Sequence, residues 1–305
     1  MVFSIDVEDW AQSVLNNSNP VSNRVYDNTL LLLDILEEHQ HKATFFTLGN
    51  VAKKHPELIR RIADAGHEVA SHGYNHDAIF KLTPKQVMED VTNSVKSLED
   101  TSGTKVIGFR APNFSIREYL FEWYCEALAE NGLKYDSSLF PMKVIKYGIE
   151  KKYSLKIFNE YGINEHYLNY MKLGKYKLPF FGGGYFRLLP YSVTKHLSSK
   201  LNEKHAVFYM HPYEVDTDEL AVVKELYGDI PLKWRLSQFV GRGSVETKLH
   251  KLMTDYNFTS FEKEFYSQEQ ENKPTLYGIQ GGRKNANAAN ASEKEHVIAT
   301  SINGV

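Results

Sequence analysis

Residues Val2–Trp10 read VFSIDVEDW, and this stretch contains the first structural element and the first candidate site of the chain. The run Val2–Asp6 predicts a buried strand that begins almost at the first residue. Asp6, Glu8 and Asp9 place three carboxylates at its end, where they repel one another unless protons or a cation intervene. The stretch therefore predicts either a solvated turn or a site where one carboxylate binds a metal and another acts as a base.

The rest of the N-terminal two thirds alternates short apolar runs with amphipathic segments. Further strands are expected at residues 43–48, 67–71, 106–109, 133–136 and 206–210, and helices at residues 24–38, 56–65, 84–102, 118–130 and 192–203. Thr83 and Gln86 have capping-box spacing, and Gly103 marks the end of the helix that they begin. This alternation predicts an α/β fold with a parallel sheet.

Two segments depart from the alternation. Residues 142–178 are basic and rich in tyrosine but only weakly periodic, so we expect an insertion or cap there. Residues 278–305 are low in complexity and in apolar side chains, so we expect a disordered tail. The expected domain is then residues 1–275, followed by a C-terminal extension.

The composition excludes several classes of protein. The 305 residues include 36 Lys and Arg against 38 Asp and Glu, and a formal charge of -2 argues against a nucleic-acid partner. The single cysteine, Cys125, excludes an intrachain disulfide and is expected in the core. The sequence shows neither a signal-peptide pattern nor an apolar run long enough for a transmembrane helix, so we expect a cytoplasmic protein.

Polar residues fall at the ends of five predicted strands. In a parallel α/β sheet or barrel, functional groups collect at the carboxyl ends of the strands. The chain delivers five such residues to the same edge: Asp6, His72, Arg110, Asp136 and His211. This convergence is a stronger indication of a site than any one of the residues.

His72 and His76 are the candidate metal ligands. Two histidines four residues apart can reach one metal from a helical turn or a tight loop, although surface or capping roles are the simpler alternative. With one carboxylate, they would leave positions open for water and substrate, as a catalytic zinc site requires. We expect one divalent metal, with zinc as the first choice and cobalt, manganese or nickel as alternatives.

Arg110 and His211 are candidates for acid–base chemistry at the same edge. Arg110 can hold a carboxylate through two hydrogen bonds, or it can form a purely structural ion pair. His211 ends an apolar strand and precedes Pro212, which places it at a rim where a histidine can act as a general acid. A packed histidine is the alternative.

A glycine-rich segment between aromatics is the last signal. Gly183 and Gly184 permit close approach to a ligand, and the neighbouring Tyr185 suits the face of a sugar ring. We count these three residues, with Pro112 and Phe114, as candidate substrate contacts. A glycine-rich turn with core aromatics is the alternative.

Five motifs in order make the chain resemble the polysaccharide deacetylase superfamily, the NodB-homology carbohydrate esterases. They are Ser4–Asp9, Ser71–His76, Arg110–Phe114, Asp136–Ser138 and Met210–Pro212. The start at Asp6–Trp10, the segment Gly182–Arg187 and the segment Phe239–Arg242 resemble the branch found in bacterial exopolysaccharide and surface-glycan loci.

The resemblance implies a distorted (β/α)7 barrel and assigns roles to the residues. Asp6 would be the catalytic base, held by Arg110, and His72 and His76 would bind metal. His211 would be the acid, oriented by Asp136. The family's usual first motif has two adjacent aspartates, of which the second binds metal. Here Val7 follows Asp6, so the ligand would be Glu8 or Asp9.

The resemblance implies a metal-dependent hydrolase that removes an N-acetyl group from an amino sugar of a surface polysaccharide or its precursor. A cyclic amide or imide hydrolase of the same superfamily and a non-catalytic carbohydrate-binding barrel are the alternatives. The substrate could be nucleotide-linked, lipid-linked or a short glycan, and a lipid-linked substrate would bring peripheral membrane contact. The oligomeric state is left open.

Overall fold

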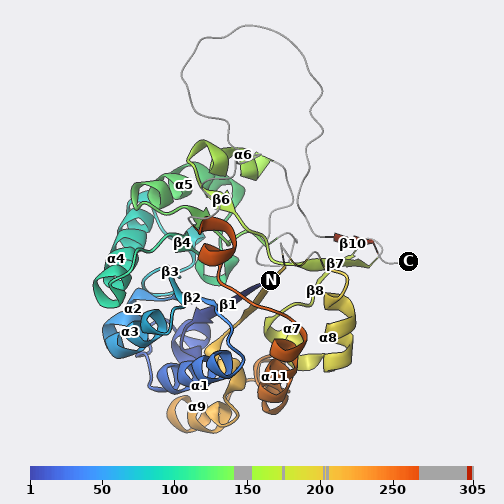
Figure 1. Cartoon of the computed structure of the whole chain (residues 1–305). Helices are drawn as coiled ribbons and strands as arrows, with labels where there is room; N and C mark the ends of the chain where they lie inside the picture. The colour runs from blue at the N-terminus through green and yellow to red at the C-terminus, as the bar shows by residue number, and fades with distance from the viewer. Residues whose placement is uncertain (141–152, 174–175, 202, 204–205, 268–300, 304–305) are drawn as a thin grey trace, which may run out of the picture.

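The computed structural model describes residues 1–140, 153–173, 176–201, 203, 206–267 and 301–303 (Figure 1). Within them, seven parallel strands form one curled sheet in the order β6-β5-β4-β3-β2-β1-β9. These strands are β1 (Val2–Val7), β2 (Thr44–Thr47), β3 (Glu68–Ser71), β4 (Gly108–Phe109), β5 (Tyr135–Asp136), β6 (Asn164–Glu165) and β9 (Val207–Met210). The arrangement confirms the expected α/β class and the distorted (β/α) barrel.

Helices surround the sheet in Figure 1. They are α1 (Arg24–Glu38), α2 (Gly49–Lys54), α3 (Pro56–Asp64), α4 (Pro84–Ser102), α5 (Phe121–Glu130), α6 (Tyr153–Glu160), α7 (Gly183–Leu188), α8 (Tyr191–Ser198), α9 (Glu219–Tyr227), α10 (Leu232–Gln238) and α11 (Val245–Asp255). The Thr83–Gln86 capping box is present, and Gly103 ends α4 in the left-handed conformation. Among the described residues, no helix is both long and apolar enough to cross a membrane.

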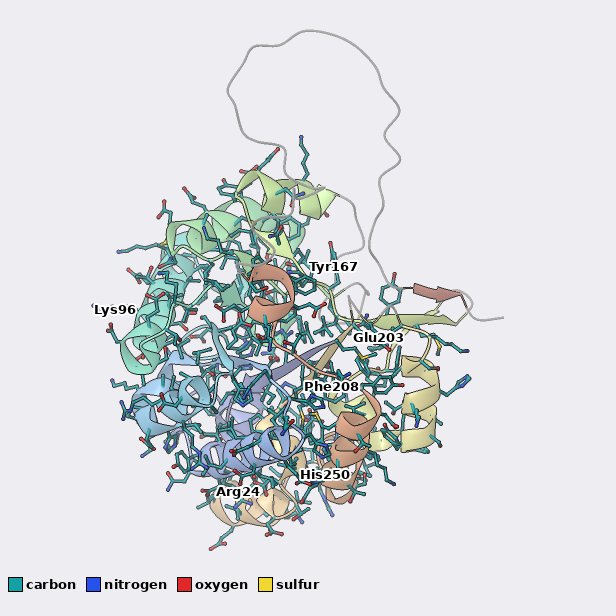
Figure 2. The ribbon with its side chains drawn as sticks, in the orientation of Figure 1. Arg24, Lys96, Tyr167, Glu203, Phe208 and His250 are labelled. Atoms are coloured by element: carbon teal, nitrogen blue, oxygen red, sulfur yellow. The ribbon has the colours of Figure 1, made fainter. Side chains whose placement is uncertain are left out.

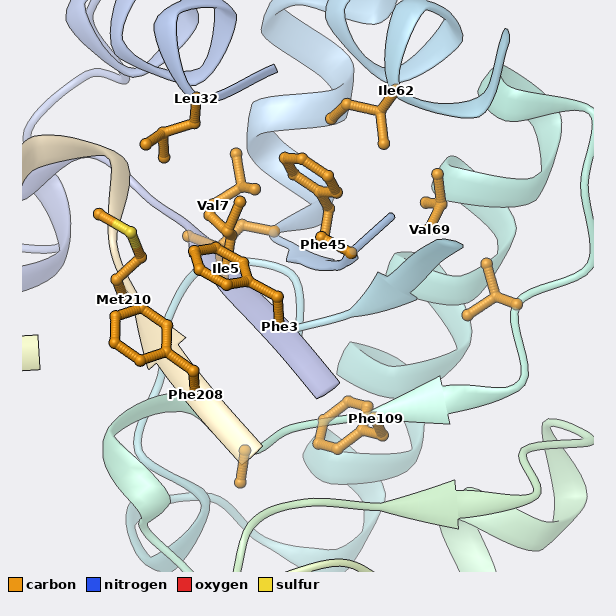
Figure 3. Close-up of a cluster of buried hydrophobic side chains, with 14 of the residues drawn as sticks. Phe3, Ile5, Val7, Leu32, Phe45, Ile62, Val69, Phe109, Phe208 and Met210 are labelled. Atoms are coloured by element: carbon orange, nitrogen blue, oxygen red, sulfur yellow. The ribbon is translucent and has the colours of Figure 1, made fainter. Parts of the chain in front are cut away.

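The core lies on both faces of β1, which is buried at all six of its positions. Parallel strands covered on both sides are apolar at nearly every position, which explains the continuous run at the start of the chain. Phe3 stacks on Phe208 of β9 at 4.8 Å between ring centroids (Figure 3). Phe3 also meets Phe258 edge-on at 5.3 Å. Figure 2 shows Phe208 inside the body, whereas Lys96 points outward from α4.

Residues 142–178, for which we expect an insertion or cap, are described only in part. Residues 141–152 and 174–175 lie outside the described part, but β6 extends the main sheet next to β5, and α6 packs against α5 through Phe158 and Phe121. A second sheet contains the antiparallel pair β7 (Tyr170–Leu173) and β8 (Tyr176–Pro179). Periodicity missed β6 because a strand of two residues is too short to show alternation.

The expected C-terminal tail is described only in part. Residues 268–300 lie outside the described residues, as does the boundary expected at residue 275. Ser301–Asn303 form β10, which pairs in parallel with β7. Their partner strand is distant in sequence, and composition carries no information about such a pairing.

Truncation of Phe3 tests the importance of the packing on β1. Phe3 is 1% exposed, and Phe→Ala in a core removes buried apolar surface and leaves a cavity. We expect Phe3→Ala to lower the free energy of unfolding by about 3–5 kcal/mol, measured by denaturant titration. Tyr119→Ala is the control, because Tyr119 is 71% exposed and its truncation should change stability by less than ~0.5 kcal/mol. Equal losses in the two variants would contradict this account of the core.

Candidate metal centre and active site

The carboxyl ends of the strands carry the polar residues that the sequence singled out. Asp6 lies in β1, His72 directly follows β3, and Arg110 directly follows β4. Asp136 ends β5, and His211 directly follows β9. Four of these five residues join one network of buried contacts, and Asp136 belongs to a neighbouring one.

Glu8, His72 and His76 form a buried group whose ligand atoms lie within 4.8 Å of one another. Glu8 Oε2 lies 2.7 Å from His76 Nε2 and 3.4 Å from His72 Nε2. Burial raises the pKa of Glu8, but the charge of His76, hydrogen bonds from His72 and His76 and the charge of His211 outweigh it and hold that pKa well below its usual range. An ionised carboxylate facing two imidazole nitrogens is a donor set that suits zinc and similar divalent metals.

Hydrogen bonding around the group leaves ligand atoms available. His72 Nδ1 lies 2.8 Å from the carbonyl oxygen of Arg110, which can only accept, so Nδ1 is the donor of this contact and Nε2 faces Glu8. Among the described residues, the buried His76 Nδ1 has no hydrogen-bond partner, and the buried Glu8 Oε2 has none beyond its ion-pair contacts with the two imidazoles. Buried polar atoms are normally paired, so this group fits a bound cation.

A tight loop, rather than a helix, brings His72 and His76 together. Gly73 has a φ of +78°, and His76 itself has a φ of +65°. The backbone N–H of Tyr74 donates to both oxygens of Asp90 at 3.1 Å, which fixes the loop on α4. A β-carbon at position 73 would lie 2.8 Å from Asp90 Oδ2, so this position requires glycine for space as well as for its backbone conformation.

Asp9 lies outside the group of potential ligands. Its Oδ1 accepts a hydrogen bond from the backbone N–H of Gln12 at 3.2 Å, and its Oδ2 accepts from the N–H of Ser22 at 3.0 Å and from the Ser22 hydroxyl. The carboxylate thus joins the loop after β1 to the segment before α1. Of the two carboxylates that the sequence left open as ligand, the geometry favours Glu8.

Arg110 holds Asp6 in the interior. Its Nη1 donates to Asp6 Oδ1 at 2.6 Å and to Ser4 Oγ at 3.1 Å, while Nε and Nη2 donate to the carbonyl and hydroxyl oxygens of Ser137. The guanidinium also lies over the ring of Phe46 at 4.1 Å. This is the contact that the resemblance implied for the two residues.

His211 lies between two carboxylates. Its Nε2 is 3.7 Å from Glu8 Oε1, and its Nδ1 is 2.9 Å from Glu214 Oε1. Burial lowers the pKa of His211, but Glu214 and Glu8 outweigh it and raise the pKa to about 9. The ring is stacked on Tyr213 at 4.7 Å and its side chain keeps 19% exposure, so it can meet a ligand from solvent.

Asp136 differs from the role that the resemblance implied. It accepts hydrogen bonds from Tyr124 Oη at 3.0 Å and Ser138 Oγ at 2.5 Å, and it pairs with the carboxyl group of Glu165. Burial raises the pKa of Asp136 to about 6. Four strands separate β5 from β9 in the sheet, and the structure gives His211 Nδ1 to Glu214 instead.

Glu214 is a functional candidate that our reading of the sequence missed. The signal was present, because His211 is followed by Pro212 and, three residues on, by Glu214, as in a capping box at the start of a helix. The structure contains that capping box, with Pro212–Val215 as a short 3₁₀ helix. Hence one local turn determines the orientation of the imidazole.

Two of the five candidate substrate contacts lie beside Tyr209 of β9. Phe114 is partly buried and meets Tyr209 edge-on at 5.7 Å, and a β-carbon at Gly183 would lie 2.9 Å from Tyr209 Oη. Pro112 is buried against Gly73. Gly184 follows in α7, and Tyr185 is 39% exposed at the surface. Phe114 and Gly183 thus flank the strand that ends at His211.

A further group of potential ligands lies elsewhere on the described part of the chain. It consists of Glu38, His39 and His250, which are exposed or only partly buried. His39 Nε2 and His250 Nδ1 are 3.0 Å apart and satisfy each other. The group around Glu8 is the stronger candidate for a metal site, because its three side chains are buried and His76 Nδ1 has no hydrogen-bond partner among the described residues.

Two histidines and a carboxylate that could hold a metal ion lie at the carboxyl edge of a curled parallel sheet, the edge at which α/β barrels place their active sites. Residues 22–135 match the family model of polysaccharide deacetylases, and residues 137–266 match a domain of unknown function, DUF3473. Residues 22–135 of the chain thus form a domain of the NodB-homology polysaccharide deacetylase superfamily.

Individual relatives agree with this assignment. An uncharacterized Bacillus subtilis protein, YlxY, is 37% identical over 30% of this chain and 28% of its own length. A Helicobacter pylori peptidoglycan deacetylase is 33% identical over 35% of this chain and 36% of its own length. The chain thus spans about a third of the length of such relatives. A solved Mycobacterium smegmatis structure, assigned to the polysaccharide deacetylases, shares the fold with a TM-score of 0.51, 22% identity and 85% coverage of both chains.

Paired carboxylate variants separate the two candidate ligands. Glu8→Gln removes an anionic ligand from the group, so we expect affinity for zinc to fall by more than ~100-fold, beyond the loss typical of an outer-shell partner. Asp9→Asn should retain metal, because Asp9 contacts Ser22 and Gln12 instead. Metal content and zinc titration of the purified variants measure this, with circular dichroism as the check on folding. Loss of metal in a folded Asp9→Asn variant and its retention in Glu8→Gln would reverse the assignment.

Proposed function

We propose that this protein is a metal-dependent deacetylase that hydrolyses the N-acetyl group of an amino sugar in a surface polysaccharide or its precursor. One observation carries the proposal: the buried Glu8–His72–His76 group lies beside His211, with an arginine-held Asp6 at the same edge of the sheet. Membership of the polysaccharide deacetylase superfamily supports the reaction class, as does the activity named for the Helicobacter relative.

Glu8, His72 and His76 would hold one divalent ion, for which zinc is the first choice. Two histidines and one carboxylate leave the remaining coordination positions open, as in catalytic zinc sites. Bound there, the ion supplies Lewis acidity, which polarises the acetyl carbonyl and lowers the pKa of water.

Asp6 would accept the proton of the attacking water. Its carboxylate is buried, and one oxygen is committed to Arg110 at 2.6 Å. The other oxygen is left for the proton. Because Arg110 is itself fixed by Ser4 and Ser137, the carboxylate is held in one orientation before substrate arrives.

His211 would donate a proton to the leaving amine nitrogen. The Nδ1–H group is directed to Glu214, so Nε2 faces the side of Glu8 and the reacting group. Protonation of the nitrogen breaks the C–N bond to give a free amino sugar and acetate. Tyr185, exposed on α7, and Phe114 offer aromatic faces for the sugar.

Removal of the base tests the reaction. Asp6→Asn keeps the size of the side chain but removes the proton acceptor, so we expect acetate release from N-acetylated oligosaccharides to fall by about 10²–10⁴-fold. A chelator should abolish release by the wild type, and zinc should restore it. Asp34→Asn, at a 64% exposed side chain, is the matched control and should keep full activity.

Acetate is quantified enzymatically, alongside ring opening of cyclic amides and imides as a second readout. Full acetate release by Asp6→Asn would exclude Asp6 as the base. Ring opening without acetate release would favour the cyclic-amide reading of the superfamily, and sugar binding without either reaction would favour a binding module.

Replacement of the His211 partner tests the acid step. Glu214→Gln removes the charge that orients the imidazole, so we expect hydrolysis of the N-acetyl amide to fall by at least ~100-fold, the lower end for acid–base catalysis. Hydrolysis of 4-nitrophenyl acetate should fall by less than about 3-fold, because its leaving group needs no proton. Parallel losses on the two substrates would indicate a structural role for Glu214 and contradict the assignment, provided that metal content and melting temperature are unchanged.

A further inference from the structure

Helix α10 has apolar side chains on two faces. On the inner face, Trp234 and Phe239 pack on the fully buried Trp10 at 6.1 and 4.8 Å between ring centroids. On the outer face, Leu232 and Leu236 lie four residues apart and are 63% and 56% exposed. Val240, two residues beyond the end of the helix, is 47% exposed. The inner contacts with Trp10 hold the helix on the protein. The apolar side chains of the outer face remain exposed in the described part of the chain.

Hydrogen bonds join α7 to the end of α10. Arg187 Nη2 donates to the carbonyl of Ser237 at 2.6 Å and Nη1 to that of Val240 at 2.8 Å. Leu188, the residue after Arg187, is 54% exposed. We call Leu188, Leu232, Leu236 and Val240 the α7–α10 patch. Exposed apolar side chains grouped on joined elements mark an interaction site more often than isolated exposed leucines do.

Cations alternate with the leucines of the patch. Lys233 and Arg235 are exposed on α10, and residues 230–245 contain no aspartate or glutamate. The acidic groups that pack nearby, Asp216 and Glu219, are buried and engaged by Arg24 and Arg242. Asp229, just before the helix, faces Lys224 at 4.0 Å. The surface of α10 therefore presents apolar side chains together with unpaired positive charge.

The patch lies at the same end of the molecule as the candidate site. Trp10, on which α10 packs, follows Glu8 by two residues, and Arg187 lies 4.0 Å from Glu214, the partner of His211. Any surface bound by α10 would thus be next to the edge of the sheet where the reaction is proposed.

We propose that the α7–α10 patch docks this protein on an anionic lipid surface. Leucine and valine side chains can enter the boundary between headgroups and acyl chains, while Lys233 and Arg235 contact lipid phosphates. A second copy of the chain fits less well, because a two-fold interface through this patch would set the same cations against each other. Docking would hold the site against the membrane, where a glycan carried by a lipid is within reach. This goes beyond the proposed function and does not depend on it.

Vesicle sedimentation of the full chain tests the proposal. Vesicles of phosphatidylcholine alone are compared with vesicles of equal parts phosphatidylcholine and phosphatidylglycerol. We expect the wild type to bind the anionic vesicles at least ~10-fold more tightly, and the double variants Leu232→Gln/Leu236→Gln and Lys233→Gln/Arg235→Gln each to weaken that binding by ~10-fold or more. Tyr119→Ser, exposed far from the patch in sequence, should bind as the wild type does.

Three results would overturn the proposal: no preference of the wild type for anionic vesicles, equal binding by the leucine double variant, or a concentration-dependent dimer that the leucine substitutions abolish. Melting temperature and acetate release from a short soluble oligosaccharide should be unchanged in both double variants. Failure of acetate release in the wild type would count against the proposed reaction and leave the vesicle result intact.

Discussion

The buried ion pair between Arg110 and Asp6 is the interaction on which the site depends. A guanidinium with no exposure is tolerated only where its hydrogen bonds and charge are satisfied, and here β1, the end of β5 and the ring of Phe46 together satisfy it. The carbonyl of Arg110 also fixes the tautomer of His72. One residue after the short strand β4 thus connects the candidate base to the candidate metal group.

The three carboxylates at the end of β1, Asp6, Glu8 and Asp9, each have a different set of contacts. Asp6 is paired with Arg110, Glu8 faces the two histidines, and Asp9 accepts hydrogen bonds from the hydroxyl and backbone of Ser22. Each carboxylate is buried, and each has a different polar partner. The departure from two adjacent aspartates is thereby accommodated.

The two regions of the chain that match family models each contribute residues to the candidate site. Asp6 and Glu8 precede the region that matches polysaccharide deacetylases, and that region contains His72, His76 and Arg110. His211 and Glu214 lie in the region that matches a domain of unknown function. Arg187 and α10 also lie there, so the second region provides both the candidate acid and the patch proposed to face lipid. The proposed chemistry requires both regions.

The sequence by itself determined the alternation of strands and helices and the position of each polar residue at a strand end. Those features depend on local periodicity and on capping signals such as Thr83 and Gln86, which are visible within a few residues. Only the tertiary structure decided that Glu8 rather than Asp9 faces the histidines, that four strands separate Asp136 from His211, and that β6 completes the sheet. The physical reason is that these choices depend on contacts between residues as far apart as Glu8 and His211. Such contacts are set by how the sheet curls, and no local pattern in the chain records that.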